Sequence, residues 1–373
     1  MRVLVIGGTG PTGPQLVNAL LARGNEVIIL HGGFHEVQFD QEIEHIHTDP
    51  HFAETLMPAL EGRTFDLVVA TYGRIKVIAE VLRGKTGRLV TVSGAGLYAA
   101  PTDQRWGPLG RPVMVREDSP LRDTEGPNDK LFHKIYLTER TVMAMHEAGE
   151  FSATILRYPI IYGPNAPASV DWCIVRRILD KRRCFILGDG GLQVSRRGFS
   201  VNVAHCLQLI VDQPQVSSGQ IYHVADDDQY TLRQRAELIA RALGHQWEYV
   251  NLPHSLACCV SPLWKESEHL AFDTTKIRGE LGYRDLVPAG EAVMQSAVWL
   301  AEHGPKRAAE MEKQLGDPFA YEAEDAVVQL SASQGLVAAA AVQFPEIGGG
   351  HMYRHPRKPG EAWSPQVEKG PSE

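Results

Sequence analysis

The chain has 373 residues, of which 43% are hydrophobic and 22% charged, a composition typical of globular proteins and long enough for two lobes. Its net charge of -8 disfavours a general binder of nucleic acids or other polyanions. The five cysteines show no C-x-x-C spacing, which favours a reducing compartment over a disulfide framework or a zinc site.

The N-terminus, "MRVLVIGG", begins a strand at once and lacks a long apolar leader. Nowhere does the sequence contain the run of about 18 apolar residues that a membrane span needs. We therefore expect a cytoplasmic protein that does not cross a membrane.

Short apolar runs alternate with helical patterns through the first half of the chain. Strands are predicted at Arg2–Ile6, Glu26–Leu30, Ile43–Thr48, Phe65–Ala70, Arg88–Ser93 and Ser152–Arg157. Helices are predicted at Pro14–Ala22, Ile75–Leu82 and Lys130–Ala148, with a long surface loop over Ala100–Asp129. This alternation is typical of an α/β fold with a parallel sheet covered by helices on both faces.

Beyond residue 165 the alternation weakens. We predict helices at Trp172–Lys181, Leu232–Leu243 and Pro288–His303, and a strand at Gln220–Ala225. We divide the chain into a dinucleotide-binding domain (1–164, with sheet elements returning later), a smaller substrate lobe (165–304) and a partly irregular extension (305–373). The Gly- and Pro-rich tail from Gly348 is expected to be disordered or to lie across its own domain or a partner.

A glycine-rich turn, "GGTGPTG", directly follows the first strand and precedes the first helix. Gly7 permits a tight turn, Gly10 lets a pyrophosphate approach the backbone, and Gly13 lets the helix pack on the sheet. The strand, the spacing and the helix together predict a dinucleotide site. The contacts expected within the turn come from Gly7, Thr9, Gly10, Pro11, Thr12 and Gly13.

The second strand ends in His31 and Gly32, where an Asp or Glu would accept hydrogen bonds from the adenosine ribose and select NAD. The absence of a carboxylate there favours NADP(H). The absence of an arginine that would clamp a 2′-phosphate leaves NAD(H) open. His31 is either a contributor of charge or a bystander.

Motifs spread over about 280 residues resemble the extended short-chain dehydrogenase/reductase family, which includes UDP-galactose epimerase and sugar-nucleotide dehydratases. The matching pieces are "GGTGPTG", "DLVVATYG", "RLVTVSGAGLY", "LRYPIIYGPN" and "FDTTKIRGELGY". The resemblance implies a Rossmann-type, doubly wound sheet that binds a nicotinamide dinucleotide, with a smaller C-terminal substrate lobe. It implies further cofactor contacts from Asp49, Tyr72, Ser93, Lys134, Tyr158 and Pro159.

The sequence departs from this family where the chemistry occurs. The family's Ser or Thr, four residues before Tyr98, is here Gly94. If Glu139 is aligned with the family's Glu, Leu131 and Ile135 stand where its Tyr-x-x-x-Lys pair belongs. Exchange of hydride at a carbonyl or hydroxyl carbon needs a proton donor or acceptor, which neither side chain supplies.

Four residues are candidate replacements in catalysis. Lys134 lies one residue from the expected lysine, and His133 beside it carries an imidazole suited to proton transfer. Ser93 and Tyr98 flank the turn after the fifth strand. The alternatives are a solvated helix face for His133 and Lys134 and a pocket wall for Tyr98.

In the predicted substrate lobe, "SRRGFSVNVAH" resembles the family segment that delivers a basic residue to a substrate anion. Arg196 and Arg197 are therefore candidate anion contacts, or else an exposed basic pair. Trp172 is a candidate wall of the substrate pocket. The stretch "HIHTDPH" places His45 and His47 on one face of a strand, and we expect no metal site.

The sequence thus predicts an NAD(P)-dependent oxidoreductase or epimerase acting on a small carbonyl, hydroxyl or sugar-like compound. The alternative is a catalytically silent NAD(P)-binding sensor or a nucleic-acid-binding relative of the same fold. The acidic charge disfavours the nucleic-acid version, and association into a homodimer stays open.

Overall fold

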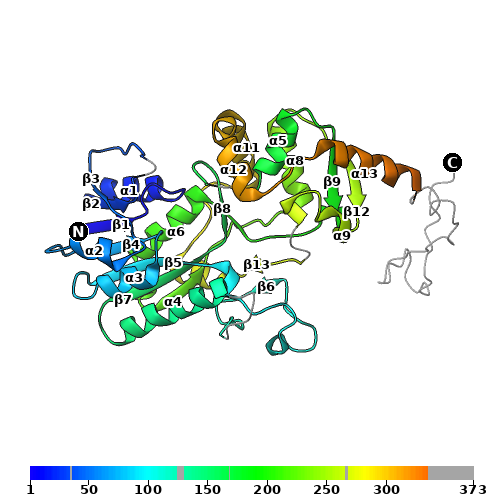
Figure 1. Cartoon of the computed structure of the whole chain (residues 1–373). Coiled ribbons are helices and arrows are strands. Elements are labelled where there is room, and N and C mark those ends of the chain that lie inside the picture. Colours follow the sequence, from blue (N-terminus) through cyan, green and yellow to red (C-terminus); the bar gives the residue numbers. More distant parts are fainter. Residues whose placement is uncertain (34–35, 124–129, 168, 265–267, 335–373) are drawn as a thin grey trace, which may run out of the picture. The chain divides into compact units, whose positions relative to one another are not determined.

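The computed structural model describes residues 1–33, 36–123, 130–167, 169–264 and 268–334. The chain forms two compact units, Met1–Ala320 and Tyr321–Glu373, and the second contributes helix α13 (Tyr321–Gln334), orange in Figure 1. The lobe boundary predicted after residue 164 falls inside the first unit and stays a prediction. Among the described residues, no helix is both long and apolar enough to cross a membrane.

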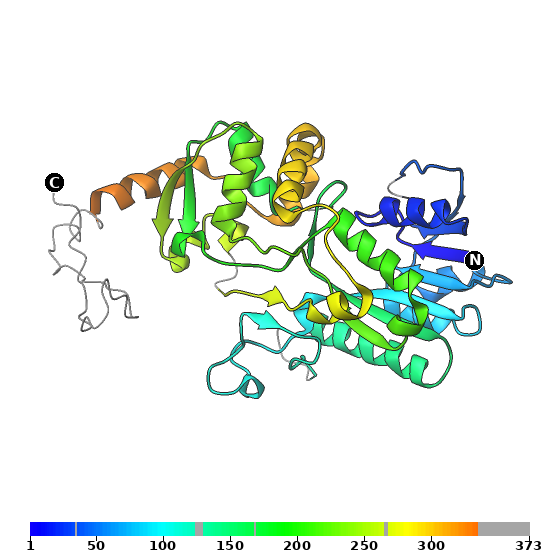
Figure 2. The same cartoon turned by 180° about the vertical axis from the view of Figure 1, so that it is seen from behind.

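A seven-stranded parallel sheet forms the centre of the first unit, in the order β11-β7-β5-β4-β1-β2-β3 (Figures 1 and 2). Its strands are β1 (Arg2–Ile6), β2 (Glu26–His31), β3 (Glu44–His47), β4 (Leu67–Ala70), β5 (Arg88–Gly94), β7 (Ser152–Tyr158) and β11 (Gln220–His223). The strand order reverses between β1 and β4, and sheets of this kind bind ligands outside the carboxyl ends of the strands at that point. The predicted Rossmann-type sheet is confirmed.

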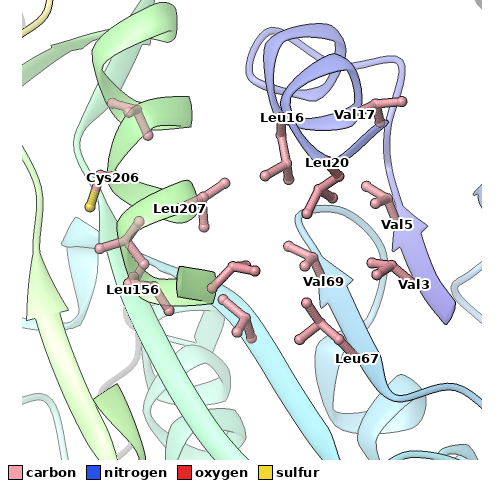
Figure 3. Close-up of a cluster of buried hydrophobic side chains, with 14 of the residues drawn as sticks. Val3, Val5, Leu16, Val17, Leu20, Leu67, Val69, Leu156, Cys206 and Leu207 are labelled. Atoms are coloured by element: carbon pink, nitrogen blue, oxygen red, sulfur yellow. The ribbon is translucent and has the colours of Figure 1, made fainter. Parts of the chain in front are cut away.

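Helices cover both faces of this sheet because successive side chains of each strand point to opposite faces. Val3 and Val5 pack under α1, α6 and α10, whereas Leu4 and Ile6 pack under α2, α3 and α4. Figure 3 shows Leu16 and Leu20 of α1 directed toward the same core as Val3, Val5 and Leu207. The bounds are α1 (Gly13–Ala22), α2 (Ala53–Ala59), α3 (Ile75–Val81), α4 (Lys130–Glu147), α6 (Ser200–Asp212) and α10 (Thr275–Leu281).

Shorter elements build the part of the first unit that lies beyond the sheet. Three two-stranded parallel pairs occur there: β8 (Ile160–Tyr162) with β10 (Arg197–Phe199), β9 (Cys184–Gly188) with β12 (Glu248–Leu252), and β6 (Met114–Val115) with β13 (Ala271–Phe272). The remaining α-helices are α5 (Trp172–Leu179), α7 (Pro214–Ser217), α8 (Leu232–Ala242), α9 (His254–Ala257), α11 (Ala289–His303) and α12 (Ala308–Leu315). Short 3₁₀ turns are η1 (Ala95–Leu97), η2 (Gln104–Trp106), η3 (Asp189–Gly191), η4 (Pro262–Trp264) and η5 (Gly304–Arg307).

The strands and helices predicted in the first half agree with the structure to within a few residues at each end. Seven of the α-helices in the described residues were not predicted: α2, α6, α7, α9, α10, α12 and α13. Helix α6 follows β10 without a side-chain N-cap, and its sequence begins with Ser and two β-branched valines, so local signals for it are weak. Its buried face against α1 stabilises it instead (Figure 3).

Candidate functional site

The glycine turn lies between β1 and α1 and has the geometry of a pyrophosphate site. Gly7 has a φ of +90°, which only glycine adopts without strain, and its N–H donates to Leu30 O at 2.9 Å. A Cβ on Gly13 would lie 2.1 Å from Gly8 O, so the start of α1 packs directly on the turn. A Cβ on Gly10 would meet only Gly7 O, at 3.5 Å. The turn is therefore tight on its protein side and open at Gly10, which fits a dinucleotide phosphate.

The same turn meets the end of β7 through a hydroxyl pair. Thr12 is the N-cap residue of α1 and is buried, and its Oγ1 lies 3.2 Å from the Tyr158 hydroxyl. Burial raises the pKa of Tyr158, so its phenol stays protonated at neutral pH. Pro11 and Pro14 carry no N–H, so the turn's backbone donors to a phosphate must come from its other residues. Thr9 and Gly10 are half-buried at the same edge.

At the end of β2, a carboxylate takes the place that the sequence leaves empty. His31 is buried and Gly32 is exposed, and Glu36 reaches back so that its Oε2 lies 3.9 Å from His31 Nε2. Burial lowers the pKa of His31 and keeps its imidazole neutral. The NADP(H) preference was predicted from the absence of a carboxylate here. Glu36 supplies one, and the preference is not supported.

Three other predicted cofactor contacts lie near this edge. Asp49 accepts a hydrogen bond from His51 at 2.6 Å, which lowers the pKa of the Asp49 carboxyl. Tyr72 follows β4, is 53% exposed, and its ring packs edge-on against His51. Pro159 is buried where the chain passes from β7 to β8, and its ring faces Gly198 of β10. The part each plays toward the cofactor stays a prediction.

A buried ion pair fixes the register of α4 on the sheet. Glu139 receives hydrogen bonds from Arg157 of β7 at 3.0 and 2.8 Å, and both side chains are buried. One turn earlier on the same face of α4, Ile135 Cδ1 lies 3.5 Å from where a Cβ on Gly94 would stand. Leu131, a further turn back, is 66% exposed. The positions aligned with the family's Ser and Lys therefore lie together and carry Gly and Ile, and the position aligned with its Tyr carries the exposed Leu131.

The exposure of Lys134 does not support its predicted role as the replacement for the family's lysine, and that role stays a prediction. Helical neighbours differ in direction by about 100°, so Ile135 facing β5 directs Lys134 away. Lys134 is exposed, and α4 neither rotates nor bulges to turn it inward. His133 also turns from β5: its ring stacks on Tyr136 and its Nδ1 lies 3.2 Å from Arg122 O.

Tyr98 is buried in the core, which disfavours both roles expected of it, as a catalytic residue and as a pocket wall. It is 2% exposed, accepts a hydrogen bond from Arg157 Nη1 at 2.8 Å, and forms a hydrogen bond with His223. Burial raises the pKa of Tyr98 and lowers the pKa of His223 to about 3. Both rings are therefore neutral core groups. Ser93, at the end of β5, has a buried Oγ that makes no hydrogen bond within the described residues.

A cavity of about 250 Å³ lies beside β8 and β10, and Arg197 is one of its walls. The Arg197 side chain is buried, its Nε donates to Ser195 Oγ at 2.9 Å, and its Nη1 has no hydrogen-bond partner in the described part of the chain. Burial, together with the nearby Arg235, lowers the pKa of Arg197 to about 10. Arg235 is itself neutralised by Asp171 at 2.6 Å. Arg197 therefore brings to the wall of this cavity a positively charged side chain whose Nη1 lacks an acceptor among the described residues.

The other substrate-lobe candidates take part in the fold. Trp172 is 0% exposed and donates through Nε1 to Glu312 Oε1 at 3.1 Å, so it is a core residue and not a pocket wall. The backbone of Arg196 pairs with Ile160 and Leu270, and a substrate role for its side chain stays a prediction.

The sequence did not indicate site residues that are brought into place by contacts between segments far apart in the chain. Asp171 and Arg235 are 64 positions apart, and neither stands in a recognisable motif. The family pattern would place the acid that binds the ribose at the end of β2, whereas Glu36 lies five residues beyond the end of that strand. For Glu36 a usable signal existed, because it is the first acid after the strand.

Residues 71–225 match the model of the NAD dependent epimerase/dehydratase family. Among curated proteins, the chain is 24% identical over 219 residues to a dTDP-glucose 4,6-dehydratase of an Actinoplanes species. That match covers 58% of this chain, which spans about three fifths (61%) of the relative's length.

Solved structures share the fold at low identity. A dTDP-glucose 4,6-dehydratase from Bacillus anthracis in complex with NAD is 16% identical with a TM-score of 0.63, covering 82% of this chain and 98% of that one. A UDP-glucose 4-epimerase from Thermotoga maritima with UDP-glucose is 16% identical with a TM-score of 0.65, covering 81% and 99%. Residues 71–225 are thus similar to the NAD dependent epimerase/dehydratase family, and the first unit shares the fold of these solved structures.

Proposed function

We propose that this chain is an NAD-dependent oxidoreductase or epimerase that acts on a phosphate-bearing, sugar-like compound, a sugar nucleotide in the first instance. The observation that carries the substrate class is the buried Arg197 guanidinium, whose Nη1 lacks an acceptor in the described part of the chain beside a cavity of about 250 Å³. A buried guanidinium N–H without an acceptor is costly, and a phosphate would supply the missing acceptor. Relatives that act on dTDP-glucose or hold UDP-glucose support this class.

The cavity is joined to the proposed cofactor edge through the strand pair β8–β10. Arg197 pairs with Ile160, two residues after Tyr158, whose hydroxyl meets the glycine turn at Thr12. A phosphate held by Arg197 would thus extend its sugar toward the end of β7. This arrangement supports a substrate that lies between the lobe and the carboxyl ends of the strands.

NAD(H), and not NADP(H), is the proposed cofactor. The Glu36 carboxylate beside His31 at the end of β2 would accept from ribose hydroxyls and would repel a 2′-phosphate. The similar dTDP-glucose 4,6-dehydratase from Bacillus anthracis was solved in complex with NAD. When bound, NAD supplies the hydride acceptor. The protein must then supply orientation and a route for the proton.

Ser93 is the residue we assign to contact the reacting substrate oxygen. Its buried Oγ has no hydrogen-bond partner in the described residues, and it ends β5 beside Gly94 and Ile135. The apolar side chains at 131 and 135 neither take up a proton nor lower a tyrosine pKa. The chemistry proposed for this chain therefore proceeds without the family's Tyr-x-x-x-Lys pair.

A second candidate is favoured by one observation, the meeting of Gly94 and Ile135 where the family has its Ser and Lys. A protein that binds NAD and a sugar nucleotide without converting the sugar nucleotide would not need the family's serine hydroxyl and lysine ammonium at these positions. This candidate differs from the first in turnover and not in binding.

Binding is tested by calorimetric titration of UDP-glucose and of dTDP-glucose into the chain saturated with NAD⁺. Arg197→Met should weaken binding at least about tenfold without lowering the melting temperature, because it removes a buried charge. Arg233→Met, an exposed change on α8, is the matched control and should bind as the parent does. Equal affinity of the Arg197→Met protein and the parent would exclude the proposed site.

Turnover is tested by following nicotinamide absorbance and product formation in the same mixtures. Any conversion supports the enzyme, whereas tight binding without conversion supports the silent alternative. In the second case, Gly94→Ser/Leu131→Tyr/Ile135→Lys should raise turnover about a hundredfold or more, the range for an added general acid. Serine fits at 94, where φ is -114° and a Cβ would lie 3.5 Å from its nearest neighbour.

A further inference from the structure

Four potential metal ligands meet at the carboxyl ends of β2 and β3. They are His31, Glu36, His45 and His47, and their ligand atoms all lie within 4.8 Å of one another. The strand register accounts for the meeting of the histidines. His31 pairs with His47 and Ile29 with His45, so all three imidazoles lie on one face of two neighbouring parallel strands. We refer to these four residues as the histidine cluster.

Several separations within the histidine cluster are close to those of a tetrahedral metal shell. His31 Nε2 lies 3.2 Å from His45 Nδ1, and Glu36 Oε2 lies 3.3 Å from His45 Nδ1. Glu36 Oε1 lies 3.1 Å from His47 Nε2. Ligand atoms at about 2.0–2.1 Å from a tetrahedral Zn²⁺ are separated by about 3.3 Å. Three of the separations therefore match those that one ion would impose, and the longer ones, among them 3.9 Å from His31 Nε2 to Glu36 Oε2, would close by small side-chain movements.

From this geometry we propose that the histidine cluster binds a divalent transition metal ion, with Zn²⁺ as the reference ion, although the sequence predicted no metal. Three imidazoles and one carboxylate suit Zn²⁺, Co²⁺, Ni²⁺ or Cu²⁺ and do not suit Mg²⁺ or Ca²⁺, which prefer oxygen ligands. The site is separate from the Arg197 cavity, but it shares His31 and Glu36 with the proposed ribose contact, so a metal ion and a ribose would compete for the Glu36 carboxylate.

The environment of the cluster also favours a cation. The Glu36 carboxylate lies 3.3 Å from His45 Nδ1 and 3.1 Å from His47 Nε2, and its negative charge would offset part of the charge of a bound cation. Glu36 and His47, each 56% exposed in the side chain, leave a path for an ion from solvent. On ligation through Nε2, the His31 Nδ1 carries a proton, so its 3.3 Å contact with the Gly33 N–H gives way.

Co²⁺ is the sharpest probe, because its visible spectrum reports coordination. The exposed neighbours Cys258 and Cys259 would compete for metal, so the parent for the test is Cys258→Ser/Cys259→Ser without a polyhistidine tag. Titration in the absence of dinucleotide keeps the result independent of cofactor binding. We expect one Co²⁺ per chain, with visible bands of a four- or five-coordinate ion, no thiolate charge-transfer band, and displacement by Zn²⁺.

Two variants of this parent locate the ion. His47→Ala, at an exposed position on the edge strand, should weaken Co²⁺ binding at least about tenfold, and His45→Ala/His47→Ala should abolish the visible bands. His303→Ala, on α11, removes an exposed imidazole elsewhere and should bind Co²⁺ as the parent does. A parent that gives no bands, or a double variant that keeps them, would overturn the proposal.

Discussion

Arg157 and Glu139 form a two-point ion pair between β7 and α4, with Arg157 Nε and Nη2 at 3.0 and 2.8 Å from the carboxylate oxygens. The pair holds α4 in one rotation about its axis. In that rotation Ile135 faces Gly94 and Lys134 faces solvent. The ion pair therefore keeps α4 in the register in which the apolar Ile135, and not Lys134, occupies the position of the family's lysine.

Removing one partner of this pair should be strongly destabilising. Glu139→Gln leaves the Arg157 guanidinium buried without its counter-charge, and we expect a loss of about 3–5 kcal/mol in the free energy of unfolding. Urea denaturation measures it. Glu147→Gln, an exposed change on the same helix, should cost less than about 0.5 kcal/mol. A loss below about 1 kcal/mol for Glu139→Gln would mean that the pair does not fix α4.

Two substitutions in the glycine turn should have different effects, one on the affinity for NAD⁺ and the other on the stability of the fold. Gly10→Val adds a side chain on the open side of the turn, so the protein should fold normally and lose NAD⁺ affinity at least about tenfold. Gly13→Ala forces a Cβ to 2.1 Å from Gly8 O and should lower the melting temperature. Calorimetric titration and thermal unfolding of both variants test this. If Gly10→Val binds NAD⁺ normally, the pyrophosphate does not lie at this turn.

Glu36 should select the cofactor. We expect the chain to bind NADH more tightly than NADPH, because a 2′-phosphate at the end of β2 would approach the Glu36 carboxylate beside His31. Glu36→Gln should reduce this preference, and Glu42→Gln, an exposed change further along the same loop, should not. Paired dissociation constants at one salt concentration, measured with EDTA present to exclude metal, decide the matter. A preference for NADPH in the parent would contradict the role of Glu36.

Asp285 gives the stability a dependence on pH. Burial, with the neighbouring Asp226 charge, raises the pKa of Asp285 to about 7 in the folded chain, against about 3.9 when unfolded. The folded state therefore holds this proton more tightly, and the group's contribution to stability falls as pH rises from about 4 to 7.

Asp285→Asn should raise the urea midpoint, most of all above pH 7, with the gain shrinking as the pH falls toward 4. An amide can still accept from the Asp227 N–H and donate to the Tyr283 oxygen, which now bond the carboxylate at 2.8 and 2.9 Å. Asp228→Asn, at an exposed neighbour, is the control and should leave the midpoint unchanged. A gain that does not vary with pH would assign the effect to something other than the Asp285 charge.

The sequence by itself determined the sheet and the glycine turn. Alternating apolar runs and a turn that needs Gly7, Gly10 and Gly13 are local requirements, so they can be read within a window of about twenty residues. The substitution of Leu131 and Ile135 for the catalytic pair was also legible, because Glu139 gave the register.

Only the tertiary structure decided which polar side chains from distant parts of the sequence contact one another. Tyr98 is adjacent to the turn in sequence, yet it lies in the core because His223, 125 positions away, and Arg157 bond its hydroxyl. Helix α6, the unpartnered Nη1 of Arg197 and the histidine cluster likewise depend on contacts between distant segments. Local pattern carries no information on such contacts, since the burial that creates them is a property of the packed chain.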